Sequence, residues 1–197
     1  RLGTRKRIII TAGPTWVAID KVRVISNIAT GETGILLAEQ FNRQGAKVTL
    51  LLGPVFNCCL NKNIKVINFR FFDELKGKVI KELRLKKYDI LIHSAAVSDY
   101  QPLKACSHKI QSGLKNLTLK LKPTEKIIDL IKRIAPHVFM VGFKFEPSAK
   151  KNLLIKKTKE LMEHAHLDLA VANTIHNGRY WAYLIGKETI NGPFSDK

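Results

Sequence analysis

The chain has 197 residues, of which 45% are hydrophobic and 25% are charged, so it has the length and composition of one well-packed globular domain. Its 34 Lys and Arg outnumber its 16 Asp and Glu, and the net charge of +18 favours anionic partners, either small phosphorylated molecules or nucleic acid. The sequence has no apolar stretch long enough for a transmembrane helix, and Cys58, Cys59 and Cys106 form neither a disulfide framework nor a zinc motif, which points to a cytoplasmic protein.

Short apolar runs that end at glycine, small or polar residues are typical of parallel strands buried on both faces. The first run leads into Gly13, and a shorter run near the end of the chain, at residues 180–185, also looks like a strand. The predicted buried strands span residues 7–11, 47–52, 64–69, 89–93, 138–142 and 167–171.

Helical spacing of apolar residues predicts four helices between these strands. The first covers residues 34–44, with Thr30 as its candidate N-cap, and Asp73, Thr124 and Ser148 are the candidate N-caps of the other three. Strands that alternate with helices predict an α/β, Rossmann-like fold, with a doubly wound, mostly parallel sheet and helices on both faces.

One segment interrupts this alternation. Residues 100–116 contain Pro, Gly, Ser and several cations without clear periodicity. A long irregular segment inside a compact domain is often a lid or a binding loop. No internal repeat or low-complexity tract divides the sequence, so we expect a single domain over residues 1–197 with a lid at residues 100–116.

Ligands of an open α/β sheet bind at the carboxyl ends of its strands, so three loops are candidate binding segments. Gly13 would let backbone N–H groups approach a phosphate, although a plain tight turn also explains it. Asn27 precedes a glycine-bearing helix entry at residues 29–34, where it could orient a carboxylate or merely cap a turn. Asp99 ends a loop of small residues that starts at Ser94, and it could accept from an exocyclic amine, help to hold a metal or cap a helix.

Several segments resemble, in the same order, the motifs of the phosphopantothenoylcysteine synthetase family. The family's TAGxT loop, IDxVRxISN segment and glycine-bearing helix entry match residues 10–34, and its AAVxDY block matches residues 95–100. The start of its lysine-rich lid matches Lys109 and Ile110. Further similar segments, which extend the resemblance over most of the chain, lie at residues 119–128, 141–146 and 168–173.

The resemblance implies a ligase that condenses 4′-phosphopantothenate with cysteine in coenzyme A biosynthesis. In this family the carboxylate of the acid attacks the α-phosphate of CTP or ATP, pyrophosphate leaves, and the amine of cysteine attacks the resulting acyl-nucleotidylate. Magnesium accompanies the nucleotide, and family members usually form homodimers. In many bacteria a flavin-binding phosphopantothenoylcysteine decarboxylase precedes this domain, so we expect a stand-alone chain with a separate decarboxylase or a piece of a bifunctional protein.

The resemblance also implies roles for individual residues. Asn27 matches the asparagine that handles the acyl-nucleotidylate and Lys109 matches the lid lysine, so these two are the candidate catalytic residues. Thr30 and Gly31 join Asn27 as candidates for binding the phosphate or carboxylate of the substrate, and no protein-held metal is expected. The candidate nucleotide-binding residues are Gly13, Thr15, Ser94, Ala95, Ala96, Asp99, Lys109, Thr124, Lys126, Phe143 and either Lys157 or Lys159.

The chain departs from the family pattern at two places in these motifs. Gln111 and Ser112 stand where many lids have lysines, so part of the positive charge of the lid is missing. Glu32 occupies a helix entry where lysine is common, and a negative side chain there disfavours phosphate. These departures leave the choice of nucleotide and the rate of reaction open.

Two other functions compete with the ligase. A NAD(P)-dependent Rossmann oxidoreductase would need a GxGxxG loop after the first strand and an acidic residue at the end of the second, which instead ends at Leu52, Gly53 and Pro54. A basic nucleic-acid-binding protein fits the charge, but the sequence has no known recognition module.

Overall fold

The computed structural model describes residues 6–56 and 59–195. Within these residues an eight-stranded sheet forms the centre of the molecule, and all its strand pairs are parallel except the two at one edge. From that edge, the strand order is β12 (Ile190–Phe194), β11 (Arg179–Ile185), β10 (Leu169–His176), β9 (Phe139–Phe145), β6 (Ile90–His93), β1 (Arg7–Ala12), β4 (Lys47–Leu52) and β5 (Lys65–Asn68).

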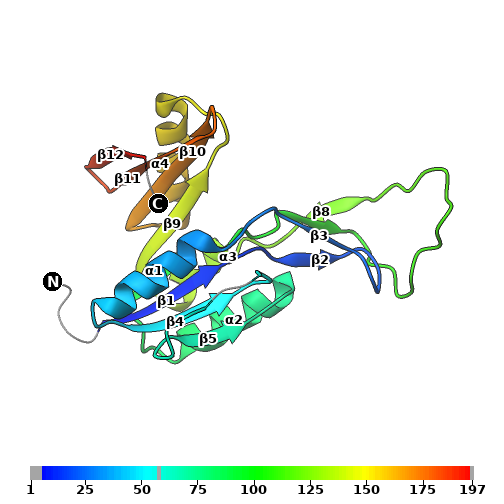
Figure 1. Cartoon of the computed structure of the whole chain (residues 1–197), viewed down its shortest axis with the longest axis horizontal. Helices are drawn as coiled ribbons and strands as arrows, with labels where there is room; N and C mark the ends of the chain where they lie inside the picture. Colours follow the sequence, from blue (N-terminus) through cyan, green and yellow to red (C-terminus); the bar gives the residue numbers. More distant parts are fainter. Residues whose placement is uncertain (1–5, 57–58, 196–197) are drawn as a thin grey trace.

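Four helices cover the two faces of this sheet (Figure 1). On one face α1 (Glu32–Arg43) packs over β1 and β4. On the other face α2 (Phe72–Arg84), α3 (Ile127–Ile134) and α4 (Lys151–Ala165) pack beside one another, as right-handed crossovers between parallel strands require. The predicted α/β, Rossmann-like fold, doubly wound with helices on both faces, is confirmed.

The core has two layers because the central strands are buried on both faces. Ile8 and Ile10 point toward α1 and pack in one apolar cluster with Ala38. Ile9, between them in the chain, points the other way and belongs to a second cluster with Leu75 of α2. All five side chains are inaccessible to solvent, which explains why these strands read as continuous apolar runs.

A narrow arm projects from the sheet and was not predicted as a unit (Figure 1). It consists of two antiparallel pairs, β2 (Trp16–Ala18) with β3 (Val24–Ser26), and β7 (Tyr100–Pro102) with β8 (Leu121–Pro123). The predicted lid at residues 100–116 thus begins as a short strand and continues as an irregular loop. We define the arm as residues 16–26 and 100–123.

Asp20 joins the two halves of the arm. Its carboxylate accepts hydrogen bonds from the backbone N–H groups of Val22 and Arg23, 2.8 Å each, and of Ile110, 3.0 Å, and it forms an ion pair with the Arg23 guanidinium. Desolvation raises the pKa of Asp20, but the three N–H groups and the guanidinium outweigh it and lower this pKa to about 2. The carboxylate therefore stays ionised and ties the loop at Ile110 to the β2–β3 turn.

Two helices begin at residues other than the ones predicted from the sequence. α1 begins after Gly31, whose positive φ of 73° occupies the N-cap position, and Thr30 accepts instead from the N–H of Glu32 at 3.3 Å. Asp73 is inside the first turn of α2, so its prediction as N-cap was wrong. Instead, the carboxylate of Glu74 in the first turn accepts a hydrogen bond from the N–H of Arg70, just before the helix, at 2.9 Å. This contact resembles the one that the acidic residue makes in a capping box.

The other two predicted N-caps were also wrong. Thr124 lies three residues before α3, and its hydroxyl donates to the carbonyl of Ser98 at 2.6 Å rather than accepting from the helix. Ser148 lies before α4 with a φ of 58°, and Lys150 occupies the N-cap position. A tertiary contact therefore engages Thr124, and a turn with positive φ contains Ser148, where the local pattern had predicted a helix cap.

Gly34 is required where α1 crosses β1. A Cβ at this position would lie 2.4 Å from Cβ of Ala12 and 2.8 Å from Oγ of Ser94. Gly34→Ala is therefore expected to lower the free energy of unfolding by about 1–3 kcal/mol, measured by urea denaturation. Gly77→Ala is the control, because a Cβ there meets nothing within 4 Å and alanine in helix α2 adds about 0.5–1 kcal/mol. Equal stabilities of the two variants would contradict this packing.

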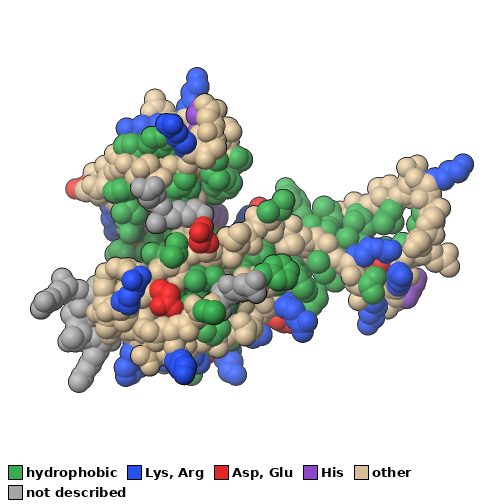
Figure 2. All heavy atoms as spheres, viewed as in Figure 1, with side chains coloured by type: hydrophobic (Ala, Val, Ile, Leu, Met, Phe, Trp, Pro, Cys, Tyr) green, Lys and Arg blue, Asp and Glu red, His purple; other side chains and the backbone are tan. Residues whose placement is uncertain are grey.

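On the face seen in Figure 2 the basic side chains are not gathered in a single patch. Figure 2 shows Lys and Arg side chains spread over the body of the molecule, the arm and the C-terminal strands on the face in view. In the part of the chain that the structure describes, no helix is both long and apolar enough to cross a membrane.

Candidate active site

The candidate site lies at the carboxyl ends of β1 and β6. The chain leaves β1 toward β4 on one side and leaves β6 toward β9 on the other, so a switch in the winding direction falls between these two strands. Such a switch point is where ligands of open α/β sheets bind. Of the residues proposed from the sequence, the structure gathers at this point Gly13, Thr15, Asn27, Thr30, Gly31, Ser94, Ala95, Ala96, Asp99, Thr124 and Lys126.

Gly13 and Gly31 bring two backbone segments into close contact. Both have positive φ, 81° and 73°, and a Cβ on Gly31 would lie 3.2 Å from the backbone nitrogen of Gly13. The N-terminus of α1 therefore meets the loop after β1 at the edge of the sheet. The N–H of Glu32 already donates to Thr30, whereas the helix dipole and the remaining N–H groups of the first turn favour an anion at this place.

Thr15 shapes the site from inside. Its hydroxyl is fully buried, donates to Oγ of Ser98 at 3.0 Å and accepts from the N–H of Ser98 at 2.9 Å. Ser94 is similarly engaged, because its hydroxyl donates to the carbonyl of Thr11 at 2.7 Å. Both side chains hold the loops after β1 and β6 together, so their hydroxyls are already used within the protein.

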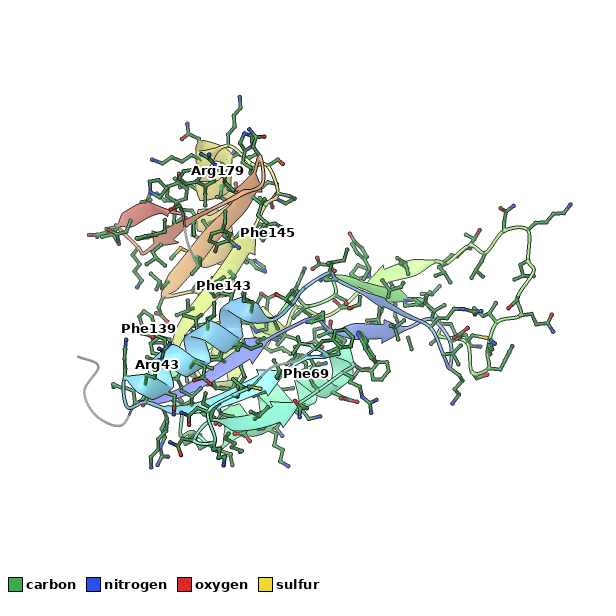
Figure 3. The ribbon with its side chains drawn as sticks, viewed as in Figure 1. Arg43, Phe69, Phe139, Phe143, Phe145 and Arg179 are labelled. Carbon is green, nitrogen blue, oxygen red and sulfur yellow. The ribbon has the colours of Figure 1, made fainter. Side chains whose placement is uncertain are left out.

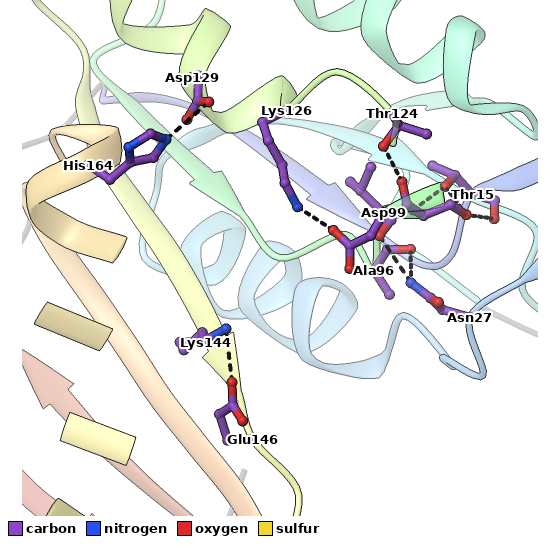
Figure 4. A network of polar contacts seen from close by, with 12 residues as sticks. Thr15, Asn27, Ala96, Asp99, Thr124, Lys126, Asp129, Lys144, Glu146 and His164 are labelled. Atoms are coloured by element: carbon purple, nitrogen blue, oxygen red, sulfur yellow. Dashed lines mark hydrogen bonds and ion pairs between the residues drawn. The ribbon is translucent and has the colours of Figure 1, made fainter. Parts of the chain in front are cut away.

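Asn27 fixes the loop after β6 from the solvent side (Figure 4). Its side-chain amide donates to the carbonyls of Ala96 at 3.2 Å and Val97 at 3.1 Å. No described residue donates to the amide oxygen of Asn27, and the side chain is exposed. The two carbonyl acceptors thus set the orientation of the Asn27 amide.

Asp99 and Lys126 form an ion pair beside Asn27 (Figure 4). The backbone carbonyl of Asp99 also accepts from the N–H of Thr124 at 2.9 Å, which fastens the loop after β6 to the segment before α3. Both charged side chains are more than half exposed. They place a carboxylate and an ammonium group side by side at the open edge of the sheet.

The next strand, β9, carries a second charged group. Phe143 is half-buried and lines an apolar groove of about 530 Å³ between α1 and β9–β11, on the side seen in Figure 3. Beyond it, the carboxylate of Glu146 contacts the ammonium groups of Lys144 and of Lys157 from α4. Lys157 was predicted, whereas Lys144 and Glu146 were missed although they belong to the matched segment at residues 141–146.

Lys109 is not brought to this site. It is exposed on the arm loop, next to Ile110, which is bound to Asp20 at the β2–β3 turn. In the described residues no hydrogen bond or ion pair joins Lys109 to Asn27 or Asp99. The same loop carries Cys106, which is a free thiol, as is Cys59, whereas Cys58 lies outside the described residues.

The carboxylates at the site do not form a metal cage. Among the described residues, no group of three or more His, Cys, Asp or Glu side chains could hold a metal ion. Asp99 is the carboxylate that stands at the switch point. A single carboxylate suits Mg²⁺ that is bound mainly through the phosphates of a nucleotide, because Mg²⁺ keeps several water ligands.

His93, the last residue of β6, is buried directly beneath the site. Burial lowers its pKa from 6.5 to about 4, and Nδ1 lies 2.9 Å from the hydroxyl of Thr11. Since the unfolded chain takes up this proton at a higher pH than the folded protein, the free energy of unfolding should fall as the pH falls from about 6.5 to 4. The free energy of unfolding should fall by up to about 1.4 kcal/mol per pH unit in this range, and His93→Gln should make it fall less. Urea denaturation at several pH values would measure this dependence. An unchanged dependence on pH in His93→Gln would contradict a neutral His93.

The fold and the site define a Rossmann-like α/β domain whose loops meet at the switch point beside a glycine-bearing helix entry. The family model described as "DNA/pantothenate metabolism flavoprotein C-terminal domain" matches residues 4–182, and the chain belongs to this family. The resemblance to phosphopantothenoylcysteine synthetases is confirmed by this match together with similar proteins and structures.

The chain is similar to longer proteins. It is 39% identical over 170 residues to the "Coenzyme A biosynthesis bifunctional protein CoaBC" of Thermococcus kodakarensis, covering 86% of this chain and 41% of that protein. The protein of the same name from Methanocaldococcus jannaschii is 35% identical, with 86% and 40% covered. A crystal structure of the DNA/pantothenate metabolism flavoprotein from Streptococcus pneumoniae aligns with a TM-score of 0.85 at 26% identity, over 94% of this chain and 91% of that one. The chain thus spans about two fifths of the length of these CoaBC relatives.

Proposed function

We propose that this chain is a phosphopantothenate–cysteine ligase, which condenses 4′-phosphopantothenate with L-cysteine through an acyl-nucleotidylate and releases pyrophosphate from CTP or ATP. The observation that carries this proposal is the fixed amide of Asn27 between the α1 entry and the Asp99–Lys126 pair at the switch point. The names of the CoaBC relatives place those proteins in coenzyme A biosynthesis. A structure of similar fold, TM-score 0.78 at 19% identity, is described as a complex of Cab2 with phosphopantothenate-cysteine.

In the proposed reaction the protein positions charges rather than moving protons. The carboxylate oxygen of the acid forms a bond to the α-phosphorus, and the bond to the bridging oxygen breaks, so that pyrophosphate leaves with the electron pair. Gly31 and Thr30 at the α1 entry, with Asn27, hold the anionic groups of the acid and of the acyl-nucleotidylate. Lys126 stands beside the phosphates and Phe143 beside the base. Such fixed donors and cations stabilise charge that develops at phosphorus.

In the second step the amine of cysteine attacks the acyl carbon and the bond from this carbon to the phosphate oxygen breaks. The nucleoside monophosphate leaves with the electron pair, and the amine gives up one proton to solvent as the amide forms. The amide oxygen of Asn27, free of protein donors among the described residues, can accept from this incoming amine. Mg²⁺ would bind through the phosphates with Asp99 as its protein ligand, and it would neutralise phosphate charge.

Lys109 takes part in the reaction through a homodimer in this proposal. Its own protomer holds it on the arm loop, anchored at Ile110 by Asp20, away from the switch point. The arm of one protomer would then act as the lid of its partner. The product would be the substrate of a phosphopantothenoylcysteine decarboxylase, supplied either by a separate protein or by another part of a bifunctional one.

Pyrophosphate release tests the proposed function. The purified protein would be given 4′-phosphopantothenate, cysteine and Mg²⁺ with CTP or ATP in turn. Release that depends on phosphopantothenate, with formation of the cysteine amide only when cysteine is present, is the expected result and identifies the nucleotide. No release with either nucleotide, from protein that is folded by circular dichroism, would contradict the ligase.

A further inference from the structure

Four cations gather at the amino ends of the strands, at the edge of the sheet opposite the candidate active site. Arg7 begins β1 and Lys47 begins β4, and the two residues are paired across these parallel strands. Lys65 begins the neighbouring β5, and Lys87 lies just before β6. The four side chains line one open pocket of about 680 Å³. We define this amino-edge pocket by Arg7, Lys47, Thr49, Lys65, Lys87 and Tyr88.

The alternation of the strands turns these cations to one face of the sheet. Because successive side chains point to opposite faces, Arg7 lies on the same face as Ile9, which packs on the α2 side. Lys47 shares a face with Leu51, which belongs to the same apolar cluster. Lys65 and the segment that follows α2 reach the pocket as well. Positive charge from neighbouring strands therefore converges in one place.

A buried polar group holds two of the four cations in position. The carboxylate of Glu82, only 7% exposed, forms ion pairs with Lys65 at 3.1 Å and Lys87 at 3.2 Å. It also accepts from the buried hydroxyl of Tyr88, which lies 3.0 Å from the hydroxyl of Thr49. Burial raises the pKa of Glu82, but the hydroxyl and the two ammonium groups outweigh it and lower this pKa. The carboxylate therefore stays ionised and counts as one negative charge.

Arg7 and Lys47 carry charge that the protein does not compensate. Among the residues that the structure describes, no hydrogen bond or ion pair engages the guanidinium of Arg7 or the ammonium of Lys47. Asp89 accepts from the backbone N–H of Arg7 at 2.7 Å, but its carboxylate pairs with Lys6, at 3.7 Å. The four cations of the pocket thus face the single carboxylate of Glu82, which leaves positive charge in excess.

We propose that the amino-edge pocket binds the phosphoryl group of a small phosphorylated molecule, at a site separate from the candidate active site. The guanidinium of Arg7 offers a planar set of donors that suits phosphate oxygens, and the ammonium of Lys47 adds a second full charge. The pocket, about 680 Å³, has the size of a small-molecule site and is larger than one phosphate needs. The amides of Asn42 and Asn63, which also line it, supply donors and acceptors for the rest of the ligand.

The shape of the charged region selects this class of ligand. The cations converge on one pocket, whereas a nucleic-acid backbone would need charges spaced along an extended face. The proposal does not depend on the ligase, since the pocket lies at the opposite ends of the strands from Asn27 and Asp99.

Inorganic phosphate is the probe for this proposal, added at constant ionic strength to the ¹⁵N-labelled full chain while the amide signals are followed by NMR. The N–H signals of Val48 and Tyr88 report on the amino-edge pocket, and those of Gly31 and Ala96 report on the candidate active site. The expected result is a saturable shift of the Val48 and Tyr88 signals that sodium chloride does not reproduce. Shifts confined to Gly31 and Ala96 would overturn the proposal.

Arg7→Ala combined with Lys47→Ala should weaken phosphate binding at the pocket signals by about tenfold or more, because charge-assisted hydrogen bonds are lost. The matched control combines Lys81→Ala with Arg84→Ala, which removes the same charge from exposed positions in the last turn of α2, outside the pocket lining. This control should keep the affinity within about twofold. Equal losses in the two double variants would overturn the pocket in favour of a general effect of charge. A hexaglutamate peptide that shifts the pocket signals where phosphate does not would also overturn it, in favour of an acidic protein segment.

Discussion

Asn27→Asp is expected to slow pyrophosphate release by about 10²–10³-fold while the protein stays folded. The amide of Asn27 donates to the carbonyls of Ala96 and Val97 and so holds the loop after β6. Aspartate has the same shape but no donor, so it would set a carboxylate oxygen against two carbonyl oxygens. It would also add negative charge where the carboxylate and phosphates of the substrates meet.

Asn191→Asp is the control for this substitution, because it makes the same chemical change at an exposed position of β12, far along the sheet from the site. Rates would be measured with saturating nucleotide, and thermal unfolding would show that both variants are folded. Release by Asn27→Asp at a rate close to that of Asn191→Asp would remove Asn27 from the mechanism.

Lys109→Ala is expected to lower turnover by about 10²-fold, although the structure leaves this side chain away from the switch point of its own protomer. An ammonium group that closes over the acyl-nucleotidylate would be lost. Lys115→Ala, exposed on the same loop of the arm, removes an equal charge and should leave turnover nearly unchanged.

Mixing the two inactive variants locates the partner of Lys109. If the arm serves the neighbouring protomer, a dimer of one Asn27→Asp chain and one Lys109→Ala chain contains one intact site. Random mixing should then restore about a quarter of the turnover of the original protein. A mixture as inactive as its components would show that Lys109 works within its own chain.

The layout of the sheet could be predicted because its signal is local. Runs such as residues 7–11 and 47–52 are apolar on both faces, and only a strand covered on two sides needs such a composition. The positions of the helix starts could not be predicted, because contacts outside the local pattern decided them. The hydroxyl of Thr124 donates to the carbonyl of Ser98, and the carboxylate of Glu74 accepts from the N–H of Arg70. The strands of the arm, three residues each, are too short to produce a periodic pattern.

Part of the candidate site could be predicted for the same reason. The site residues at the ends of β1 and β6 directly follow buried strands, so the topology of the sheet alone brings Gly13 near Ala96. Lys157 was predicted from the family resemblance, but its contact with Glu146 was not, because Lys157 reaches Glu146 only through the packing of α4 on β9. A signal was nevertheless present: two charged residues, Lys144 and Glu146, directly follow a buried strand at a ligand-binding edge.

The arm has a thermodynamic consequence for the proposed dimer. Two-stranded sheets are marginal in water on their own, and the strands of the arm project beyond the main sheet and leave Val24, Tyr100 and Leu121 exposed. Contact with a second protomer would supply the missing burial, so ordering of the arm and association of the chains become one linked equilibrium. The specific activity of such an enzyme then depends on its own concentration, and dilution below the dissociation constant of the dimer disables every site at once.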